Sequence, residues 1–126
     1  MVKSKIRILC FGEAMVELSS VDLRKKITQI GFAGDTLNTA IYMKRVLAEG
    51  AKVDYLTVIG QDLFSDHLKR YIKSELIGTD LIRRTDRRNI GLYAINIESS
   101  GEREFAYWRD GSAARLLFNC EQDFLT

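Results

Sequence analysis

Residues 35–78 read DTLNTAIYMKRVLAEGAKVDYLTVIGQDLFSDHLKRYIKSELIG. A largely apolar run from Val53 to Ile59 lies in the middle of this segment. Apolar residues recur at helical spacing on both sides of the run, from Leu37 to Ala48 and from Phe64 to Leu76. Apolar strands that alternate with amphipathic helices are typical of βαβ units and a mostly parallel sheet. The segment therefore predicts an α/β fold.

The ends of the two helices also carry signals. Asp35 is the expected N-cap of the first helix and Gly50 its stop, since a short acidic side chain can accept the free N–H groups of a first turn. Asp62 is the expected N-cap of the second helix, which is predicted to run to about Leu76, just before Gly78.

Further strands are predicted before the first helix. The run Ile6–Phe11 is short and apolar and indicates a mostly buried strand. Apolar and polar residues alternate over residues 13–18, which predicts a second, more exposed strand. Residues 27–30 suit another short strand, followed by a turn over residues 31–34.

After Gly78 the pattern changes to that of a hairpin. Two segments of period two, Ile90–Glu98 and Arg103–Arg109, are joined by Ser-Ser-Gly-Glu. We expect this hairpin and the strand near residues 13–19 to form a small accessory sheet beside the α/β core. Residues 115–126 resemble the start of another helix. A parallel sheet needs helices on both of its faces, which two long strands and two helices do not provide. The chain is therefore interpreted as the first part of a longer protein.

Composition excludes several classes of protein. The 126 residues are 46% hydrophobic and 29% charged, close to globular averages and unlike disordered chains. No apolar run approaches the ~18 residues of a membrane span, and no signal peptide is recognisable. We therefore expect a cytoplasmic protein that does not bind membranes.

Charge and metal-ligand content add further exclusions. A net charge of +2 does not indicate nucleic-acid binding, and the arginine cluster at residues 83–88 is interpreted as a solvated loop. Cys10, Cys120 and the single His67 have no zinc-site spacing, so no metal site is expected. The two cysteines are interpreted as buried thiols of a reducing compartment.

The first candidate site is the turn and helix start, Gly-Phe-Ala-Gly-Asp-Thr-Leu-Asn, over residues 31–38. A glycine such as Gly34 lets a ligand approach the backbone, and the first turn of a helix presents free N–H groups. Asp35 can accept hydrogen bonds from hydroxyls, and Asn38 can both donate and accept. This set suits a polyhydroxylated ligand. The alternative is a capped helix that follows a glycine turn and binds nothing.

The second candidate site lies on the hairpin. Strand alternation places Tyr107 and Arg109 on one face, and Tyr93 lies on the other arm. Arginine is a planar fork suited to carboxylates, and tyrosines supply an apolar wall with a hydroxyl tip. Together they could hold a small acid. The alternative is a structural hairpin with aromatic cross-strand pairs and a solvated Arg109.

Four stretches of the chain carry a resemblance to a known family. They are residues 12–18 (GEAMVEL), 34–40 (GDTLNTA), 59–65 (IGQDLFS) and 101–109 (GEREFAYWR). The chain resembles the ribokinase-like (PfkB) sugar kinases, and within them the branch that acts on 2-keto-3-deoxygluconate. Ala33 departs from the pattern, because it stands where the family usually has the first of two glycines.

The resemblance implies an α/β core with a small β-sheet lid, the lid strands lying near residues 13–19, 90–98 and 103–109, and a sugar bound between core and lid. Residues 1–126 would be the N-terminal portion of a single kinase domain, an incomplete fold that lacks the C-terminal nucleotide-binding half. The implied substrate-binding residues are Gly34, Asp35, Asn38, Tyr93, Tyr107 and Arg109. No catalytic residue is implied, because the base motif of the family has no counterpart here.

The implied reaction is transfer of a phosphoryl group from ATP, with Mg²⁺, to 2-keto-3-deoxygluconate, which gives the 6-phosphate. The 126 residues alone are expected to be inactive and to bind ATP and Mg²⁺ weakly or not at all. The resemblance also suggests a homodimer formed through the lid. The alternatives are another sugar kinase of the fructokinase type and a non-catalytic module that binds a sugar acid.

Overall fold

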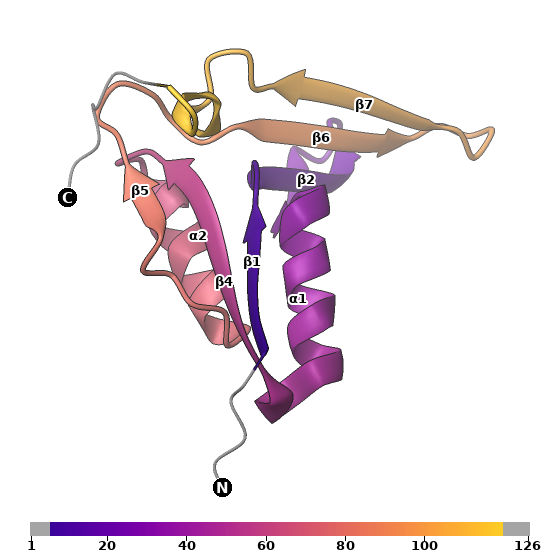
Figure 1. The fold of residues 1–126 in the computed structure, drawn as a ribbon. Coiled ribbons are helices and arrows are strands. Elements are labelled where there is room, and N and C mark those ends of the chain that lie inside the picture. Colours follow the sequence, from indigo (N-terminus) through magenta and orange to yellow (C-terminus); the bar gives the residue numbers. More distant parts are fainter. Residues whose placement is uncertain (1–5, 120–126) are drawn as a thin grey trace, which may run out of the picture.

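The computed structural model describes residues 6–119, which form two β-sheets and two α-helices (Figure 1). The core sheet is wholly parallel and has the strand order β1 (Ile6–Phe11), β4 (Ala51–Ile59), β5 (Ile82–Arg84). The lid sheet has the order β3 (Ile27–Ala33), β2 (Met15–Asp22), β6 (Leu92–Ile97), β7 (Arg103–Trp108). In the lid, β2 runs parallel to β6, while β3 and β7 are antiparallel to their neighbours.

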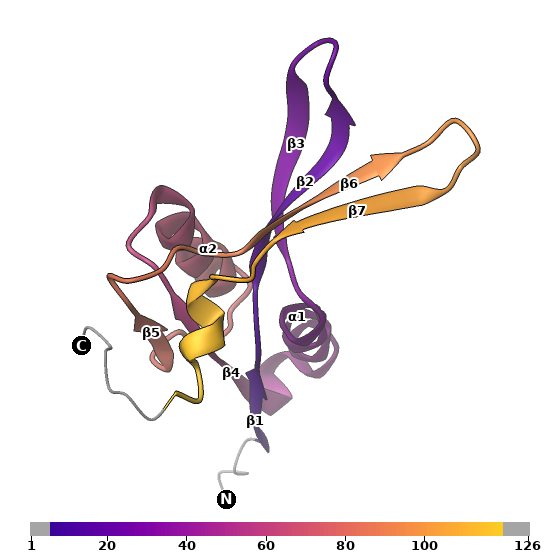
Figure 2. The ribbon, with the colours of Figure 1, turned by 90° about the horizontal axis from the view of Figure 1, so that it is seen from above.

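The predicted α/β fold with an accessory sheet is therefore confirmed. The lid lies across the ends toward which β1 and β4 point (Figure 1), and from above its two hairpins, β2–β3 and β6–β7, spread apart (Figure 2). In parallel α/β sheets, ligands bind beyond the carboxyl ends of the strands. The lid covers that end of this core.

The two helices differ at their N-termini. Helix α2 (Leu63–Ser74) begins as predicted, with the Asp62 carboxylate accepting the Ser65 backbone N–H at 2.9 Å. Helix α1 (Asp35–Leu47) does not, because Asp35 is its first helical residue and Gly34 its N-cap. The Asp35 carboxylate is thus not used as a cap. Helix α1 ends before Gly50, at Leu47, and a 3₁₀ turn, η1 (Ala48–Gly50), follows.

One hydrophobic cluster holds the helices to the sheet. It joins Leu37, Ala40 and Ile41 of α1, Leu68 and Ile72 of α2, and Val53, Tyr55 and Ile59 of β4. These three residues of β4 are two or four apart, so they share one face of the strand. Both helices therefore pack on the same face of the core sheet.

The prediction that the first strand is mostly buried is wrong. Ile6, Leu9 and Phe11 of β1 are each about half exposed, because β1 is an edge strand in the described part of the chain and pairs only with β4. Ile8 and Cys10 alone face the cluster and are partly buried. Apolarity predicted the strand correctly, but its burial depends on neighbours that the strand itself does not encode.

Several boundaries differ from the predictions. Residues 83 and 84 belong to β5 rather than to a loop, and Arg84 pairs with Asp66 at 2.7 Å. Strand β3 extends through the residues predicted as a turn and joins the lid. Strands β2, β6 and β7 overlap the three lid strands predicted near residues 13–19, 90–98 and 103–109, and β3 is a fourth strand of the lid sheet. The 3₁₀ helix η2 (Ala113–Leu116) overlaps the start of the helix expected over residues 115–126. Residues 120–126, with Cys120, lie outside the described residues.

Candidate functional site

A cavity of about 340 Å³, here called the site cavity, lies where the lid meets the start of α1. All six predicted substrate-binding residues line it. They are Gly34, Asp35 and Asn38 from the core and Tyr93, Tyr107 and Arg109 from the lid. The structure thus joins the two candidate sites, which are about 55 residues or more apart in the sequence, into one.

The core wall depends on a close approach of two backbones. A Cβ atom on Gly34 would lie 2.3 Å from the backbone oxygen of Glu13, so only glycine fits there. The φ of Gly34 is 165°, which any residue adopts, so the requirement is one of space and not of dihedral freedom. Ala33 ends β3 and is not among the residues with positive φ, so the departure from the family's glycine pair leaves this turn without backbone strain.

The start of α1 is also fixed from the other side. Gly12 has a φ of +149°, and a Cβ there would lie 2.5 Å from the Thr36 hydroxyl oxygen. That hydroxyl shares a 2.8 Å hydrogen bond with the Tyr55 hydroxyl of β4. Burial of Tyr55 raises its pKa to about 12, so the phenol stays neutral. Contacts with β4 and the β1–β2 loop therefore hold the helix N-terminus in place.

The lid wall is a row of aromatic rings that ends in a cation. Tyr93 and Tyr107, directly opposite in the β6–β7 register, stack at 5.8 Å between ring centroids. Phe105, two residues earlier on β7, stacks with Tyr107 at 6.2 Å between ring centroids, and the Arg109 guanidinium lies 5.1 Å from the Tyr107 ring centroid. Such a wall can contact the apolar side of a sugar and place a cation at one end of it.

The hydroxyl of Tyr93 is already engaged. It donates to the Glu17 carboxylate of the neighbouring strand β2. Burial, and then the hydrogen bond and the charge of Glu17, raise the pKa of Tyr93 well above its usual range. Tyr93 therefore presents its ring to the cavity as a neutral phenol.

Four further residues line the site cavity and were not predicted. They are Glu13, Met15, Thr36 and Phe105. Glu13 accepts a hydrogen bond from the Ser112 hydroxyl, and its other oxygen lies 3.9 Å from Arg109 Nη1. Glu13 and Met15 lie in the GEAMVEL stretch that carries the family resemblance, which is the signal that could have directed attention to them.

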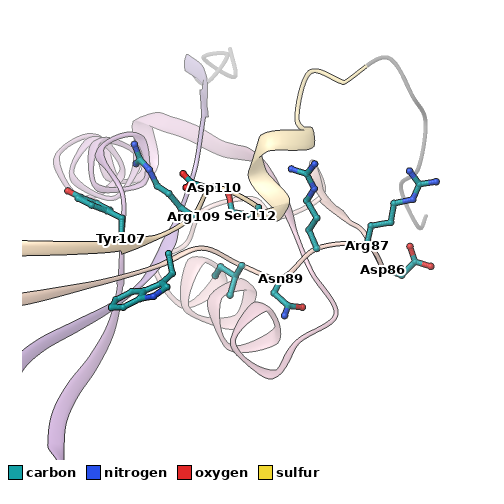
Figure 3. Close-up of a pocket in the computed structure, with 11 residues that line it drawn as sticks. Asp86, Arg87, Asn89, Tyr107, Arg109, Asp110 and Ser112 are labelled. Carbon is teal, nitrogen blue, oxygen red and sulfur yellow. The ribbon is translucent and has the colours of Figure 1, made fainter. Parts of the chain in front are cut away.

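A second, larger hollow of about 570 Å³ adjoins the site cavity (Figure 3). It shares Tyr107 and Arg109 with the site cavity and extends past Ser112 to Arg87 and Asp86. The close-up shows Arg109, Asp110 and Ser112 toward one end and Asp86 and Arg87 toward the other. Arg87 and Arg88 of the arginine cluster, which was interpreted as a solvated loop, thus border the hollow beside the site cavity.

Neither a metal-binding cluster nor a membrane-spanning helix is found among residues 6–119. Within that range no group of three or more His, Cys, Asp or Glu side chains is arranged to hold a metal ion. No helix of the same range is long and apolar enough to cross a membrane.

A parallel α/β core, a β-sheet lid over its carboxyl ends and a cavity with polar and aromatic lining between them define a class of lidded α/β proteins. Residues 5–123 match the pfkB family carbohydrate kinases, and the chain belongs to this family. It is 44% identical over 111 residues to a 2-dehydro-3-deoxygluconokinase of Dickeya dadantii. The matching segment covers 86% of this chain and 34% of the relative. The corresponding Escherichia coli K12 protein is 40% identical over 119 residues and is covered to 37%. The chain thus spans about a third of the length of these curated relatives.

Solved structures agree with this assignment. A fructokinase from Xylella fastidiosa, determined with bound ATP, has a TM-score of 0.76 and 31% identity, over 89% of this chain and 33% of that one. A 2-dehydro-3-deoxygluconokinase from Thermotoga maritima has the same TM-score of 0.76 at 22% identity, over 88% of this chain and 34% of the other, and shows the fold alone. The predicted ribokinase-like architecture is confirmed.

Proposed function

We propose that residues 1–126 are the N-terminal portion of one kinase domain that transfers the γ-phosphoryl group of ATP to 2-keto-3-deoxygluconate, giving the 6-phosphate. This sugar acid is the 2-dehydro-3-deoxygluconate after which the Dickeya dadantii and Escherichia coli relatives are named. One observation carries the proposal: three core residues and three lid residues, chosen from the sequence for a hydroxylated acid, line a single cavity.

Each wall of the site cavity suits one part of such a ligand. Asp35 and Asn38 offer acceptors and donors for hydroxyl groups. Gly34 lets the start of α1 lie against the Glu13 backbone, which holds these two side chains at the cavity. The stacked tyrosines form a flat apolar surface. Arg109 supplies a cationic fork for the carboxylate, which is a charge-assisted pair. An open-chain or cyclic sugar acid would thus be held along its hydroxyls and fixed at its acid end.

ATP and Mg²⁺ are assigned to the rest of the kinase. The described residues hold no cluster of metal-ligating side chains, and no residue of this chain is proposed as the catalytic base. When bound, the nucleotide would supply the phosphoryl group and the metal would neutralise its developing charge. The role proposed for this chain is to bind the acceptor, 2-keto-3-deoxygluconate, and to orient its terminal hydroxyl.

The first test is binding by the 126-residue chain. Titration with 2-keto-3-deoxygluconate, followed by NMR shifts of backbone amides, should perturb residues of the site cavity, and ATP should not compete. The chain alone should show no sugar-dependent ATP turnover. Saturable turnover in a preparation free of other kinases would contradict the assignment of the nucleotide site to other segments.

The second test joins this chain to the remaining segments of a full-length relative. In a chimera, this chain replaces the matching segment of the Dickeya dadantii relative, to which it is 44% identical. The chimera should phosphorylate 2-keto-3-deoxygluconate in preference to fructose and gluconate. A preference for fructose would contradict the sugar-acid proposal.

A fructokinase activity is the second candidate, and one observation favours it. The charged side chains that line the site cavity are Glu13, Asp35 and Arg109, two carboxylates against one cation. A neutral sugar would tolerate this charge balance. Arg109→Ala separates the two candidates, because it should weaken binding of a sugar acid strongly and of fructose only slightly.

We also propose that the lid mediates a homodimer. The lid face opposite the site cavity exposes Ile30 and Trp108, each about 60% exposed, and has a groove that contains Ala94 and Ala106. A face of this kind is typical of a protein interface. Light scattering at micromolar concentration should give the mass of two chains, and Trp108→Glu should reduce it to one. A single-chain mass for the parent would contradict the proposal for this chain.

A further inference from the structure

The side chain of Glu13 joins parts of the site that are far apart in the sequence. It belongs to the short loop between β1 and β2, and its side chain is 20% exposed. One carboxylate oxygen accepts from Ser112, which follows β7, and the other faces Arg109 at 3.9 Å. Its backbone oxygen is the atom against which Gly34 packs. Glu13 therefore contacts the core wall and the lid wall together.

The lid leaves space for this side chain at Gly91. A Cβ atom on Gly91 would lie 2.9 Å from the Glu13 carboxylate and 3.2 Å from the Cβ of Arg109. Gly91 is buried, and its carbonyl accepts the Val16 N–H at 2.9 Å, so the backbone is fixed at this point. The absence of a side chain at Gly91, just before β6, thus leaves room for the Glu13 carboxylate beside Arg109.

The turn after β7 is tied to the same carboxylate. The Arg109 carbonyl accepts the Ser112 N–H at 3.0 Å, which closes the turn, and the Ser112 hydroxyl then donates to Glu13. Ser112 is 3% exposed. Arg109 is therefore held at three places: its carbonyl in this turn, its guanidinium over Tyr107, and its charge beside Glu13.

We propose that Glu13 is a positioning residue, which orients the Arg109 guanidinium toward the site cavity and so sets the preference for an acidic sugar. The inference deepens the proposed function and rests on it. A guanidinium has five donors in a fork, so it can face Glu13 and still present N–H groups to a ligand carboxylate. Without Glu13, Arg109 keeps its place on Tyr107 but gains rotational freedom, and part of its binding contribution is lost.

The test uses the 126-residue chain and a double-mutant cycle. Glu13→Gln keeps an acceptor for Ser112 and removes the charge beside Arg109. We expect 2-keto-3-deoxygluconate to bind about fivefold more weakly, as for a partly exposed ion pair. In an Arg109→Ala background the same change should alter binding by less than about twofold, because the partner is gone. Glu104→Gln, on the opposite face of β7, is the matched control and should leave binding unchanged.

Two results would overturn the proposal. An equal loss from Glu13→Gln in both backgrounds would show that Glu13 does not act through Arg109. Tighter binding of the sugar acid by Glu13→Gln would show that Glu13 mainly offsets the charge of Arg109. If Glu13→Gln lowers the thermal midpoint too far for a titration, Ser112→Ala removes only the tether and should weaken binding in the same direction.

A readout without ligand separates this inference from the proposed function. The side-chain Nε–Hε NMR signal of Arg109, assigned by its loss in Arg109→Lys, should shift and exchange faster with water in Glu13→Gln. It should stay in place in Glu104→Gln. If the sugar acid does not bind but the signal moves, the positioning role stands and the substrate proposal fails. An unchanged signal refutes the positioning role whatever the chain binds.

Discussion

The close contact between Gly34 and Glu13 makes Gly34→Ala a strong test of the site's construction. The new methyl carbon would lie 2.3 Å from the Glu13 backbone oxygen, roughly 1 Å inside ordinary van der Waals contact. Both partners are backbone, so no side chain can swing aside. Either the β1–β2 loop or the start of α1 must move. Overpacking of this kind typically costs ~1–3 kcal/mol, and we expect about 2 kcal/mol here.

The chain offers a matched control at Gly31. Nothing lies within 4 Å of a Cβ placed there, and the residue is in β3. Gly31→Ala should leave the free energy of unfolding unchanged or raise it by about 0.5 kcal/mol, because alanine restricts the unfolded chain. Urea denaturation followed by far-UV circular dichroism measures both. If the two variants differ by less than about 0.5 kcal/mol, the contact between Gly34 and Glu13 is not tight and the account of the core wall fails.

Three further predictions concern single side chains. In the chimera, Arg109→Ala should raise the KM for 2-keto-3-deoxygluconate about 10- to 30-fold and leave the KM for ATP nearly unchanged, a moderate effect because the Arg109 side chain is 44% exposed and its charge is screened. Arg109→Lys should recover only part of the loss, because lysine lacks the planar fork. A KM for the sugar acid within about twofold of the parent would remove Arg109 from the site. Thr57→Val should leave the free energy of unfolding unchanged or raise it by about 1 kcal/mol in thermal unfolding, because the buried Thr57 hydroxyl has no hydrogen-bond partner among residues 6–119. A clear loss of stability would show that the hydroxyl does have a partner. Burial raises the pKa of Asp62, but hydrogen bonds from Ser65 and Ile90 outweigh it and lower the pKa overall. The Asp62 carboxylate should therefore stabilise the chain above about pH 4 and lose that contribution as the pH falls through its lowered pKa. Asp62→Asn should then flatten the pH dependence of the free energy of unfolding, measured by urea denaturation, below about pH 5. An unchanged pH dependence would contradict the stabilising role of Asp62.

Local patterns predicted most elements of the fold. Side chains a few residues apart set the hydrophobic periodicity of an element, so the sequence predicted β4, α1, α2 and the β6–β7 hairpin. The short strand β5 was missed because three residues rich in arginine carry no strand signal; it exists because it pairs with the end of β4. Asp35 was misassigned as a cap because an acidic residue at a helix start fits both the N-cap and the first turn.

The six residues predicted to bind substrate all line one cavity, and their role in binding stays a prediction. The family resemblance added what spacing could not supply. Glycine, acid and amide at a helix start, and aromatics with an arginine on one strand face, are local signals. Their convergence on one cavity depends on the parallel pairing of β2 with β6, two strands about 75 residues apart. No local pattern encodes such a pairing. Glu13 was missed for the same reason, since its partners Ser112 and Arg109 lie almost 100 residues away.

The sequence by itself determined the class of fold, the order of most elements and the chemical character of the site, because these depend on residue type and short-range spacing. Only the tertiary structure decided which surfaces are covered and which groups meet. It left Leu9 and Phe11 of the apolar strand β1 exposed, because burial requires a neighbour that β1 lacks within residues 6–119. It also placed the Glu13 carboxylate beside Arg109, because long-range strand pairing brings the lid back over the first loop of the chain.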